Sequence, residues 1–229
     1  GDKINFLGVR LDSGDLAYLS KQVRKQLDAA GFPDAKIYAS NDLDENTILN
    51  LKMQKAKIDV WGVGTKLITA YDQPALGAVY KIVSMEDTIK LSNNAEKVST
   101  PGKKQVWRIT SRAKGKSEGD YITFADTDVN ALDEINMFHP TYTYINKTVR
   151  DFDAVPLLVP IYDKGQLIYD LPSLDEIKAY ATKELDELWN EYKRVLNPQD
   201  YPVDLAKDVW DNKMTLIDNV RKKAHDLSE

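Results

Sequence analysis

The feature that most constrains the fold is a unit of strand, polar loop and helix that occurs three times in the first third of the chain. Apolar segments at residues 4–9, 35–39 and 58–61 predict buried strands. The first two lead into amphipathic segments that predict helices, and the third leads into a short helical turn. A further strand is predicted over residues 78–83. This alternation predicts a parallel sheet or a (β/α) barrel, and three units are too few to close an eight-stranded barrel.

The first polar loop combines a cation and an anion. Arg10 and Asp12 follow the first predicted strand, and Ser13 and Asp15 frame a turn that can cap the next helix. Ligands of βα sheets and barrels bind at the carboxyl ends of the strands, so this pair lies where chemistry is expected. The alternative is an Arg10–Asp12 ion pair of structural value only, and the pattern by itself leaves both interpretations open.

The next two loops are also polar. The second supplies hydroxyl, amide and carboxyl groups, and the third supplies two glycines, whose backbone N–H groups can approach an anion, and a hydroxyl. The residues concerned are Ser40, Asn41, Asp42, Gly62, Gly64 and Thr65. Taken alone, such glycines are more often explained by a tight turn that needs positive φ. Three polar loops at one edge of a sheet nevertheless favour a ligand site.

Composition excludes several function classes. The chain has 229 residues and a net charge of -5, which argues against a broad nucleic-acid footprint. Cysteine is absent, so disulfides, thiolate zinc sites and thiol catalysis are excluded. No apolar stretch approaches the roughly 18 residues of a membrane span, and no signal peptide is recognised. The chain begins directly in a predicted strand without Met, which is typical of the interior of a longer protein.

The pattern changes after the first third. Residues 105–110 and 121–124 alternate like strands around a basic loop at 111–119, and residues 155–162 and 166–169 also resemble strands. That loop can meet phosphates or be solvated. Ser173 and Glu176 form a capping box for a helix that is expected to end at 197–198, and a second helix is expected to begin near Asp204.

Residues 8–16, 40–45, 61–65, 76–81 and 101–108 resemble the nicotinate phosphoribosyltransferase family, in order and over most of the chain. The resemblance covers the carboxyl-terminal half of such an enzyme. It implies an α/β fold that is part of a distorted (β/α) barrel of the type II phosphoribosyltransferase kind, with a β insertion and carboxyl-terminal helices. The expected segments are a barrel portion with the phosphoribosyl site at 1–92, a β-rich insertion with return strands at 93–170, and helices at 171–229.

The resemblance also implies a reaction. Family members form nicotinate mononucleotide and pyrophosphate from nicotinate and phosphoribosyl pyrophosphate with coupled ATP hydrolysis, in the biosynthesis of NAD. Mg²⁺, a cytoplasmic homodimer and an amino-terminal half missing from this chain are implied, with neither nucleic acid nor membrane as partner. Two alternatives stay open: a non-catalytic fragment or half of a split protein, and an enzyme for nicotinamide or quinolinate.

Roles for single residues follow from the same resemblance. Arg10 matches the arginine of the Arg-x-Asp-Ser-Gly-Asp motif, which faces nicotinate, and Asp12 matches the acid near the ribose hydroxyls. A guanidinium suits this task because it can bind both oxygens of a carboxylate at once. The loop of Ser40, Asn41 and Asp42 is expected in the phosphoribosyl pocket. Gly62, Gly64 and Thr65 are expected to hold the 5-phosphate.

The resemblance lacks one expected residue. The family's phosphorylatable histidine precedes the Arg-x-Asp motif, whereas this chain has only His139 and His225, both after it. We expect structural roles for both. The sequence therefore assigns substrate-binding residues to this chain, but no catalytic residue and no metal ligand.

Overall fold

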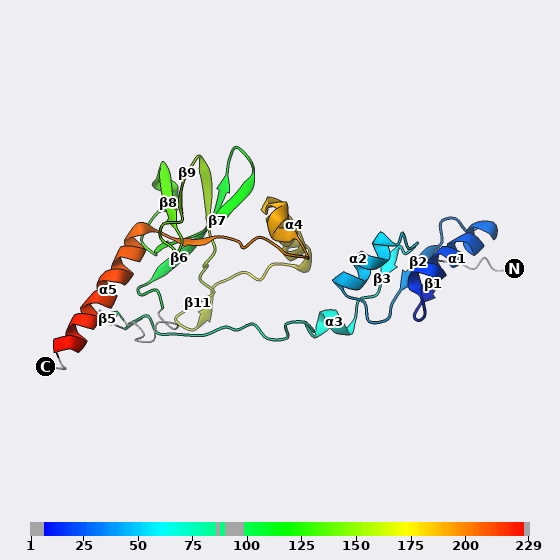
Figure 1. Cartoon of the computed structure of the whole chain (residues 1–229), viewed down its shortest axis with the longest axis horizontal. Helices are drawn as coiled ribbons and strands as arrows, with labels where there is room; N and C mark the ends of the chain where they lie inside the picture. The colour runs from blue at the N-terminus through cyan, green and yellow to red at the C-terminus, as the bar shows by residue number, and fades with distance from the viewer. Residues whose placement is uncertain (1–6, 86–87, 90–98, 227–229) are drawn as a thin grey trace. The chain divides into compact units, whose positions relative to one another are not determined.

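A computed structural model describes residues 7–85, 88–89 and 99–226. The chain divides into two compact units, residues 1–79 and 80–229, which are described separately (Figure 1). The predicted boundary between residues 92 and 93 lies outside the described residues. The boundary between 170 and 171 stays a prediction.

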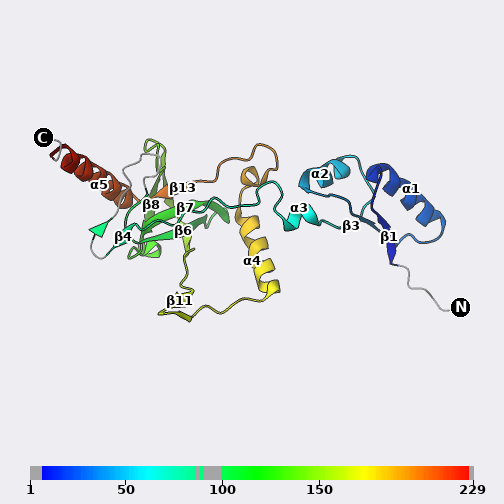
Figure 2. The same ribbon diagram turned by 90° about the horizontal axis from the view of Figure 1, so that it is seen from below.

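The first unit consists of the predicted βα repeats. Its parallel sheet has the order β1-β2-β3, with β1 Gly8–Leu11, β2 Lys36–Ala39 and β3 Val60–Trp61. The helices are α1 Leu16–Ala29, α2 Glu45–Met53 and the single turn α3 Thr65–Ile68. Sequential parallel pairing puts successive crossovers on one face, and Figure 2 shows α1 and α2 on the same side of the strands. This confirms the predicted fold class for a partial barrel.

Helix caps fix where the polar loops end. The backbone N–H of Tyr18 donates to the Asp15 carboxylate at 2.9 Å, and that of Thr47 donates to Asp44 at 2.7 Å. Both acceptors satisfy N–H groups that a first turn cannot pair internally. Gly31, at φ 85°, follows the carboxyl end of α1 in the left-handed conformation that glycine adopts without strain. These local signals are the ones that the sequence displays.

The first strand differs from its prediction. Residues 4–6 lie outside the described residues, and β1 continues to Leu11. Arg10 is therefore a strand residue, paired in register with Tyr38 of β2, rather than the first residue of a loop. Its backbone is fixed by the sheet, which makes its side-chain direction predictable from strand alternation.

The second unit contains a six-stranded sheet in the order β10-β6-β7-β13-β8-β9. All its pairs are antiparallel except β13 with β7. The bounds are β6 Lys104–Ser111, β7 Lys116–Phe124, β8 Glu134–Phe138, β9 Asn146–Arg150, β10 Phe152–Pro156 and β13 Val203–Leu205. Two small antiparallel pairs accompany it, β4 Ser84–Met85 with β5 Thr88–Ile89 and β11 Tyr162–Asp163 with β12 Gln166–Leu167.

Among the described residues of this unit, two helices and two 3₁₀ turns accompany the strands. They are η2 Val129–Ala131, α4 Leu174–Glu187, η3 Asn190–Lys193 and α5 Lys207–Asp226. The capping box of Ser173 and Glu176 is formed as predicted. In the described part of the chain, none of the helices has the length and apolarity that a bilayer crossing requires.

Several predicted elements are wrong. Residues 78–83 form no strand: the described residues offer them no pairing strand, and Tyr80 is 95% exposed. The run at 155–162 is interrupted after Pro156, since β10 stops pairing with β6 there. Apolar residues alone do not make a strand, because the backbone needs a neighbour to pair with.

The carboxyl-terminal helices also differ from prediction. The first helix ends at Glu187 rather than at 197–198, because Trp189 turns away and donates its indole N–H to the carbonyl of Ser117 at 2.9 Å. Asp204 does not begin a helix. It lies in β13, between β7 and β8, and α5 begins only at Lys207.

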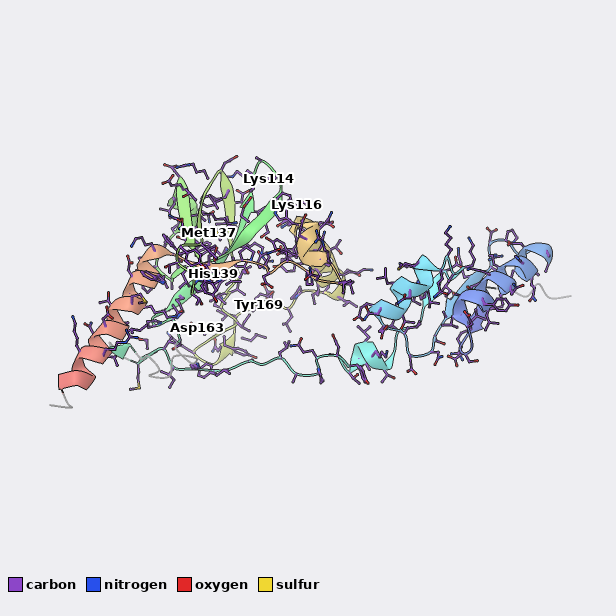
Figure 3. All side chains as sticks on the ribbon, viewed as in Figure 1. Lys114, Lys116, Met137, His139, Asp163 and Tyr169 are labelled. Carbon is purple, nitrogen blue, oxygen red and sulfur yellow. The ribbon has the colours of Figure 1, made fainter. Side chains whose placement is uncertain are left out.

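The predicted basic loop is mostly strand, because β7 begins at Lys116 and the hairpin turn is short. Lys116 donates to the carbonyl of Asp186 at 2.5 Å, and Lys114 lies 5.6 Å from the centre of the Trp189 ring. Figure 3 shows both lysines at the hairpin next to α4. Cations at the carboxyl end of a helix are favoured by its dipole, so these charges serve the packing of α4.

Candidate functional site

Arg10, Asp12 and Ser40 form a connected cluster across the ends of β1 and β2. The Arg10 guanidinium lies 3.0 Å from the Asp12 carboxylate and donates to the Ser40 hydroxyl at 2.9 Å. Ser40 donates in turn to Asp12 at 2.5 Å. In the described residues both Arg10 contacts use Nη1, so the Nε and Nη2 groups have N–H donors left that can donate to a second carboxylate.

The cluster lies on the face of the sheet that α1 and α2 do not cover. Val9 and Leu11 line one groove with residues of α1, and Leu11 packs against the cluster that contains Leu16, so strand alternation turns Arg10 to the opposite face. Tyr38, the register partner of Arg10, shares that face. The side chains of Arg10 and Asp12 are 63% and 55% exposed, which makes both accessible to a ligand.

Asn41 and Asp42 continue the second loop in an uncommon backbone conformation. Their φ angles are 97° and 46°, and non-glycine residues rarely adopt positive φ. Such conformations persist where surrounding structure imposes them, and they concentrate at functional sites. Here Leu43 is buried on one side of the pair and Ser40 is held by Arg10 on the other.

The third loop lies against the second at Gly62. A Cβ on Gly62 would lie 3.3 Å from that of Ser40, and its N–H donates to the carbonyl of Ala39 at 2.7 Å. A Cβ on Gly64 would meet no described atom within 4 Å, so the space there is open. The structure thus brings Gly62 to the cluster, whereas Gly64 and Thr65 border open space beside it. Since α3 is a single turn, an anion there would rely on loop N–H groups rather than on a helix dipole.

One ion pair at these loops was not predicted from the sequence. The Lys66 ammonium lies 2.5 Å from Asp44, in loops separated by 22 residues. Its hydrogen bond, with those from Thr47, holds the pKa of Asp44 far below the ordinary value, and the same contact raises the pKa of Lys66. Both groups therefore stay charged at neutral pH. No local sequence signal identifies the pair, because only the register of β2 with β3 brings it together.

The described residues contain no group of three or more His, Asp or Glu side chains that could hold a metal ion. His139 has the structural role expected of it: its Nδ1 accepts the N–H groups of Thr141 at 3.1 Å and Tyr142 at 2.9 Å. The chemistry at the cluster is therefore that of one guanidinium, carboxylates, hydroxyls and backbone N–H groups.

The comparisons with known proteins agree with one another. Residues 103–213 match the family model described as nicotinate phosphoribosyltransferase C-terminal domain. A nicotinate phosphoribosyltransferase of Bacillus subtilis is 56% identical over 100% of this chain and 48% of its own length. That of Homo sapiens is 33% identical over 88% of this chain and 39% of its own. The loops of the cluster precede the matched model range and are covered by the Bacillus subtilis relative.

Solved structures give the same picture. The chain superposes on the crystal structure of human nicotinic acid phosphoribosyltransferase with a TM-score of 0.73 and 28% identity, over 92% of this chain and 40% of that one. A nicotinate-nucleotide pyrophosphorylase from Pyrococcus furiosus, at TM-score 0.51 and 23% identity, shares the fold. The chain spans less than half the length of these relatives.

Proposed function

Because the chain belongs to the nicotinate phosphoribosyltransferase family, as a carboxyl-terminal portion, we propose that it supplies the phosphoribosyl site of such an enzyme. The whole protein would make nicotinate mononucleotide and pyrophosphate from nicotinate and phosphoribosyl pyrophosphate, with coupled ATP hydrolysis, in NAD biosynthesis. The observation that carries this proposal is the cluster of Arg10, Asp12 and Ser40 on the open face of the sheet.

The geometry supports a different role for each of the three loops. Arg10 presents its Nε and Nη2 donors to the nicotinate carboxylate while Asp12 and Ser40 fix Nη1. This holds the pyridine nitrogen for attack on ribose C1. Asp12 faces the ribose hydroxyls, and the loop of Ser40, Asn41 and Asp42 borders the sugar. Residues 62–65 receive the 5-phosphate in the open space at Gly64.

These contacts serve one displacement. The pyridine nitrogen forms the bond to C1 as the bond from C1 to pyrophosphate breaks, and positive charge develops on the ribose in an oxocarbenium-like transition state. Binding both substrates at fixed positions removes much of the entropic barrier to their reaction. The Asp12 carboxylate can also stabilise the developing positive charge.

Mg²⁺ fits this site as a companion of the substrate rather than as a resident metal. Mg²⁺ binds one or two carboxylates together with phosphate oxygens, and Asp12 retains a carboxylate oxygen outside its contacts with Arg10 and Ser40. Asp12 would face the metal. Mg²⁺ would neutralise charge on the leaving pyrophosphate.

We further propose a partner for the exposed edge of the first unit. β1 is an outer strand, and beside it Val9, Leu11, Val23, Leu27 and Phe32 line an apolar groove of about 540 Å³. An amino-terminal half of the protein would pair with this edge and fill the groove, completing the barrel. A homodimer in the cytoplasm is the assembly and compartment that accompany this proposal.

Calorimetry tests the proposal that residues 62–65 hold the 5-phosphate. It uses the family-length protein, which is a protein of the length of the relatives that contains this chain. Gly64→Val should weaken nicotinate mononucleotide and leave nicotinate, which has no phosphate, nearly unaffected. A Cβ at this position meets no described atom of this chain within 4 Å, so the described residues leave room for the new side chain. Thr65→Ala should have the same selectivity at roughly 1 kcal/mol, the value of one neutral hydrogen bond. Equal weakening of both ligands in a folded variant would contradict the assignment.

A further inference from the structure

The ion pair of Asp44 and Lys66 joins two of the three site loops directly. Asp44 ends the loop that begins at Ser40, and Lys66 follows Thr65 at the end of the third loop. Their charged groups are 2.5 Å apart. Gly62 also approaches Ala39 and Ser40, and Val63 packs against the apolar cluster that includes Leu43, but the ion pair is the tie between charged side chains of these loops.

Asp44 divides its two oxygens between two tasks. Oδ1 accepts the N–H of Thr47 and so caps α2, while Oδ2 accepts the Lys66 ammonium. A carboxylate fixed by a helix cap cannot follow a moving lysine, so the cap also fixes the position of Lys66. The second and third loops are thereby held to the same helix.

Lys66 is held from more than one side. Its Nζ lies 5.8 Å from the centre of the Tyr71 ring, and its side chain is 31% exposed against 63% for Arg10. Asp42 adds to the negative field around it, and the raised pKa of Lys66 reflects these neighbours, with Asp44 first. A lysine whose positive charge is already compensated by a neighbouring carboxylate is poorly placed to act as the principal cation for a phosphate.

We propose that Lys66 is a positioning residue, which through Asp44 holds the turn at 62–65 against the loop at 40–44 so that the 5-phosphate cradle exists before the ligand arrives. This inference rests on the proposed function of those loops. Binding to a preformed loop avoids the entropic cost of ordering it, so the pair contributes to affinity without touching the ligand.

Three variants of the family-length protein separate positioning from contact. Lys66→Met removes the cation, and Asp44→Asn removes the anion while keeping a side chain that caps α2 equally well. The third carries both changes. We expect each single variant to bind nicotinate mononucleotide about three- to tenfold more weakly in calorimetry, with nicotinate affinity changed less than about twofold. The double variant should be no weaker than either single one, because both break the same link.

Two further variants serve as controls. Lys66→Arg keeps the ion pair and should restore most of the affinity for nicotinate mononucleotide. Lys207→Met removes a lysine from an ion pair of similar length, 2.6 Å to Asp211 in α5, and should change neither ligand. Thermal unfolding of each variant shows whether it is folded.

The outcomes are distinct. If Asp44→Asn leaves the affinity for nicotinate mononucleotide unchanged or tightens it while Lys66→Met weakens it, Lys66 contacts the phosphate and positioning is overturned. If both ligands weaken equally, or neither changes, the pair is merely structural and the inference is also overturned. If the unaltered protein fails to bind nicotinate mononucleotide, the proposed function itself fails.

Discussion

The two units use charge in opposite ways. In the second unit Arg108 lies between Asp120, at 3.0 Å, and Glu184, at 2.5 Å, and it is 21% exposed. In the first unit Arg10 makes similar contacts with Asp12 and Ser40 but is 63% exposed. The partly buried Arg108 links α4 to the sheet. The exposed Arg10 has donors left for a ligand, which is what a binding arginine requires.

Tyr201 has its hydrogen-bond partners within the second unit. Its hydroxyl donates to Asp120 at 2.9 Å and lies 2.6 Å from the Ser117 hydroxyl, and burial raises its pKa to about 12. Although burial opposes the charge of Arg108, Asp120 raises the pKa of that group above its ordinary value. All these groups find partners within their own unit.

The described apolar core of the second unit is also larger than that of the first unit. Twelve buried residues form one cluster in the second unit, against five in the first. The first unit has only three short strands, and its two outer strands have an open edge among the described residues. The first unit, which carries the candidate site, therefore depends more than the second on other protein segments that pack against it for its stability.

The largest expected effect is on turnover. We expect the 229-residue chain by itself to make no nicotinate mononucleotide, because its first unit leaves the barrel open and the family histidine is absent from it. A steady-state assay with nicotinate, phosphoribosyl pyrophosphate and ATP measures this. Product formed in proportion to purified chain would show that the first unit is complete as it stands.

Core substitutions compare the stability of the units. Ile37 in the first and Ile109 in the second are both fully buried. Ile109→Ala should lower the unfolding free energy of the second unit by about 2–5 kcal/mol, the cost of a buried large-to-small change. In hydrogen exchange, Ile37→Ala should remove the protection of backbone amides in residues 8–61, while the amides of β6 and β7 stay protected. Simultaneous loss of protection in both regions would mean that the units unfold as one.

Matched arginine substitutions separate ligand binding from structure. In the family-length protein, Arg10→Lys keeps the positive charge but loses the two parallel N–H donors that bind both oxygens of a carboxylate. We expect kcat/KM for nicotinate to fall by about tenfold to more than a hundredfold, which is about 1.5–3 kcal/mol. Arg108→Lys should instead lower the melting temperature and leave KM for nicotinate unchanged. Kinetics within twofold of the parent for Arg10→Lys would make Arg10 structural.

Local signals explain what the sequence predicts well. The cap Ser173 can be assigned from sequence, and the caps of α1 and α2 can be narrowed to Ser13 or Asp15 and to Asp42 or Asp44, because a cap depends on residues within one helical turn. The structure selects Asp15 and Asp44. The site loops are also predictable, because the Arg-x-Asp motif lies at the carboxyl end of β1, although the strand continues to Leu11. That Arg10 shares a face with Tyr38 requires the register of β1 with β2, which no local pattern contains.

The errors have one physical cause, which is dependence on distant partners. β13 is three residues long and exists because β7 and β8 pair with it on either side. Residues 78–83 have the composition of a strand but no such partner among the described residues. The end of α4 is set by Trp189 reaching Ser117, and the ion pair of Asp44 with Lys66 has the same origin.

The smallest expected effect concerns Asp204, a residue of β13 that lies between β7 and β8 in the larger sheet and is 7% exposed. Burial raises its pKa, although the charges of Lys147 and His139 oppose the shift. A carboxyl with a raised folded pKa contributes stability that is complete below its unfolded pKa of about 3.9 and is lost as the pH rises through the folded pKa. Asp204→Asn cannot ionise and should avoid that loss.

The variant should therefore match the parent most closely in acid and become relatively more stable as the pH rises toward neutrality, until the parent carboxyl is fully ionised. Urea unfolding of the second unit, followed at several pH values between about 4 and 8, measures the difference. Asp170→Asn, at an exposed position, should show no such trend. A difference that is constant with pH would mean that folding does not change the pKa of Asp204. A difference that shrinks as the pH rises would mean that Lys147 stabilises Asp204 as an anion, so that the central strand of this sheet holds a charge.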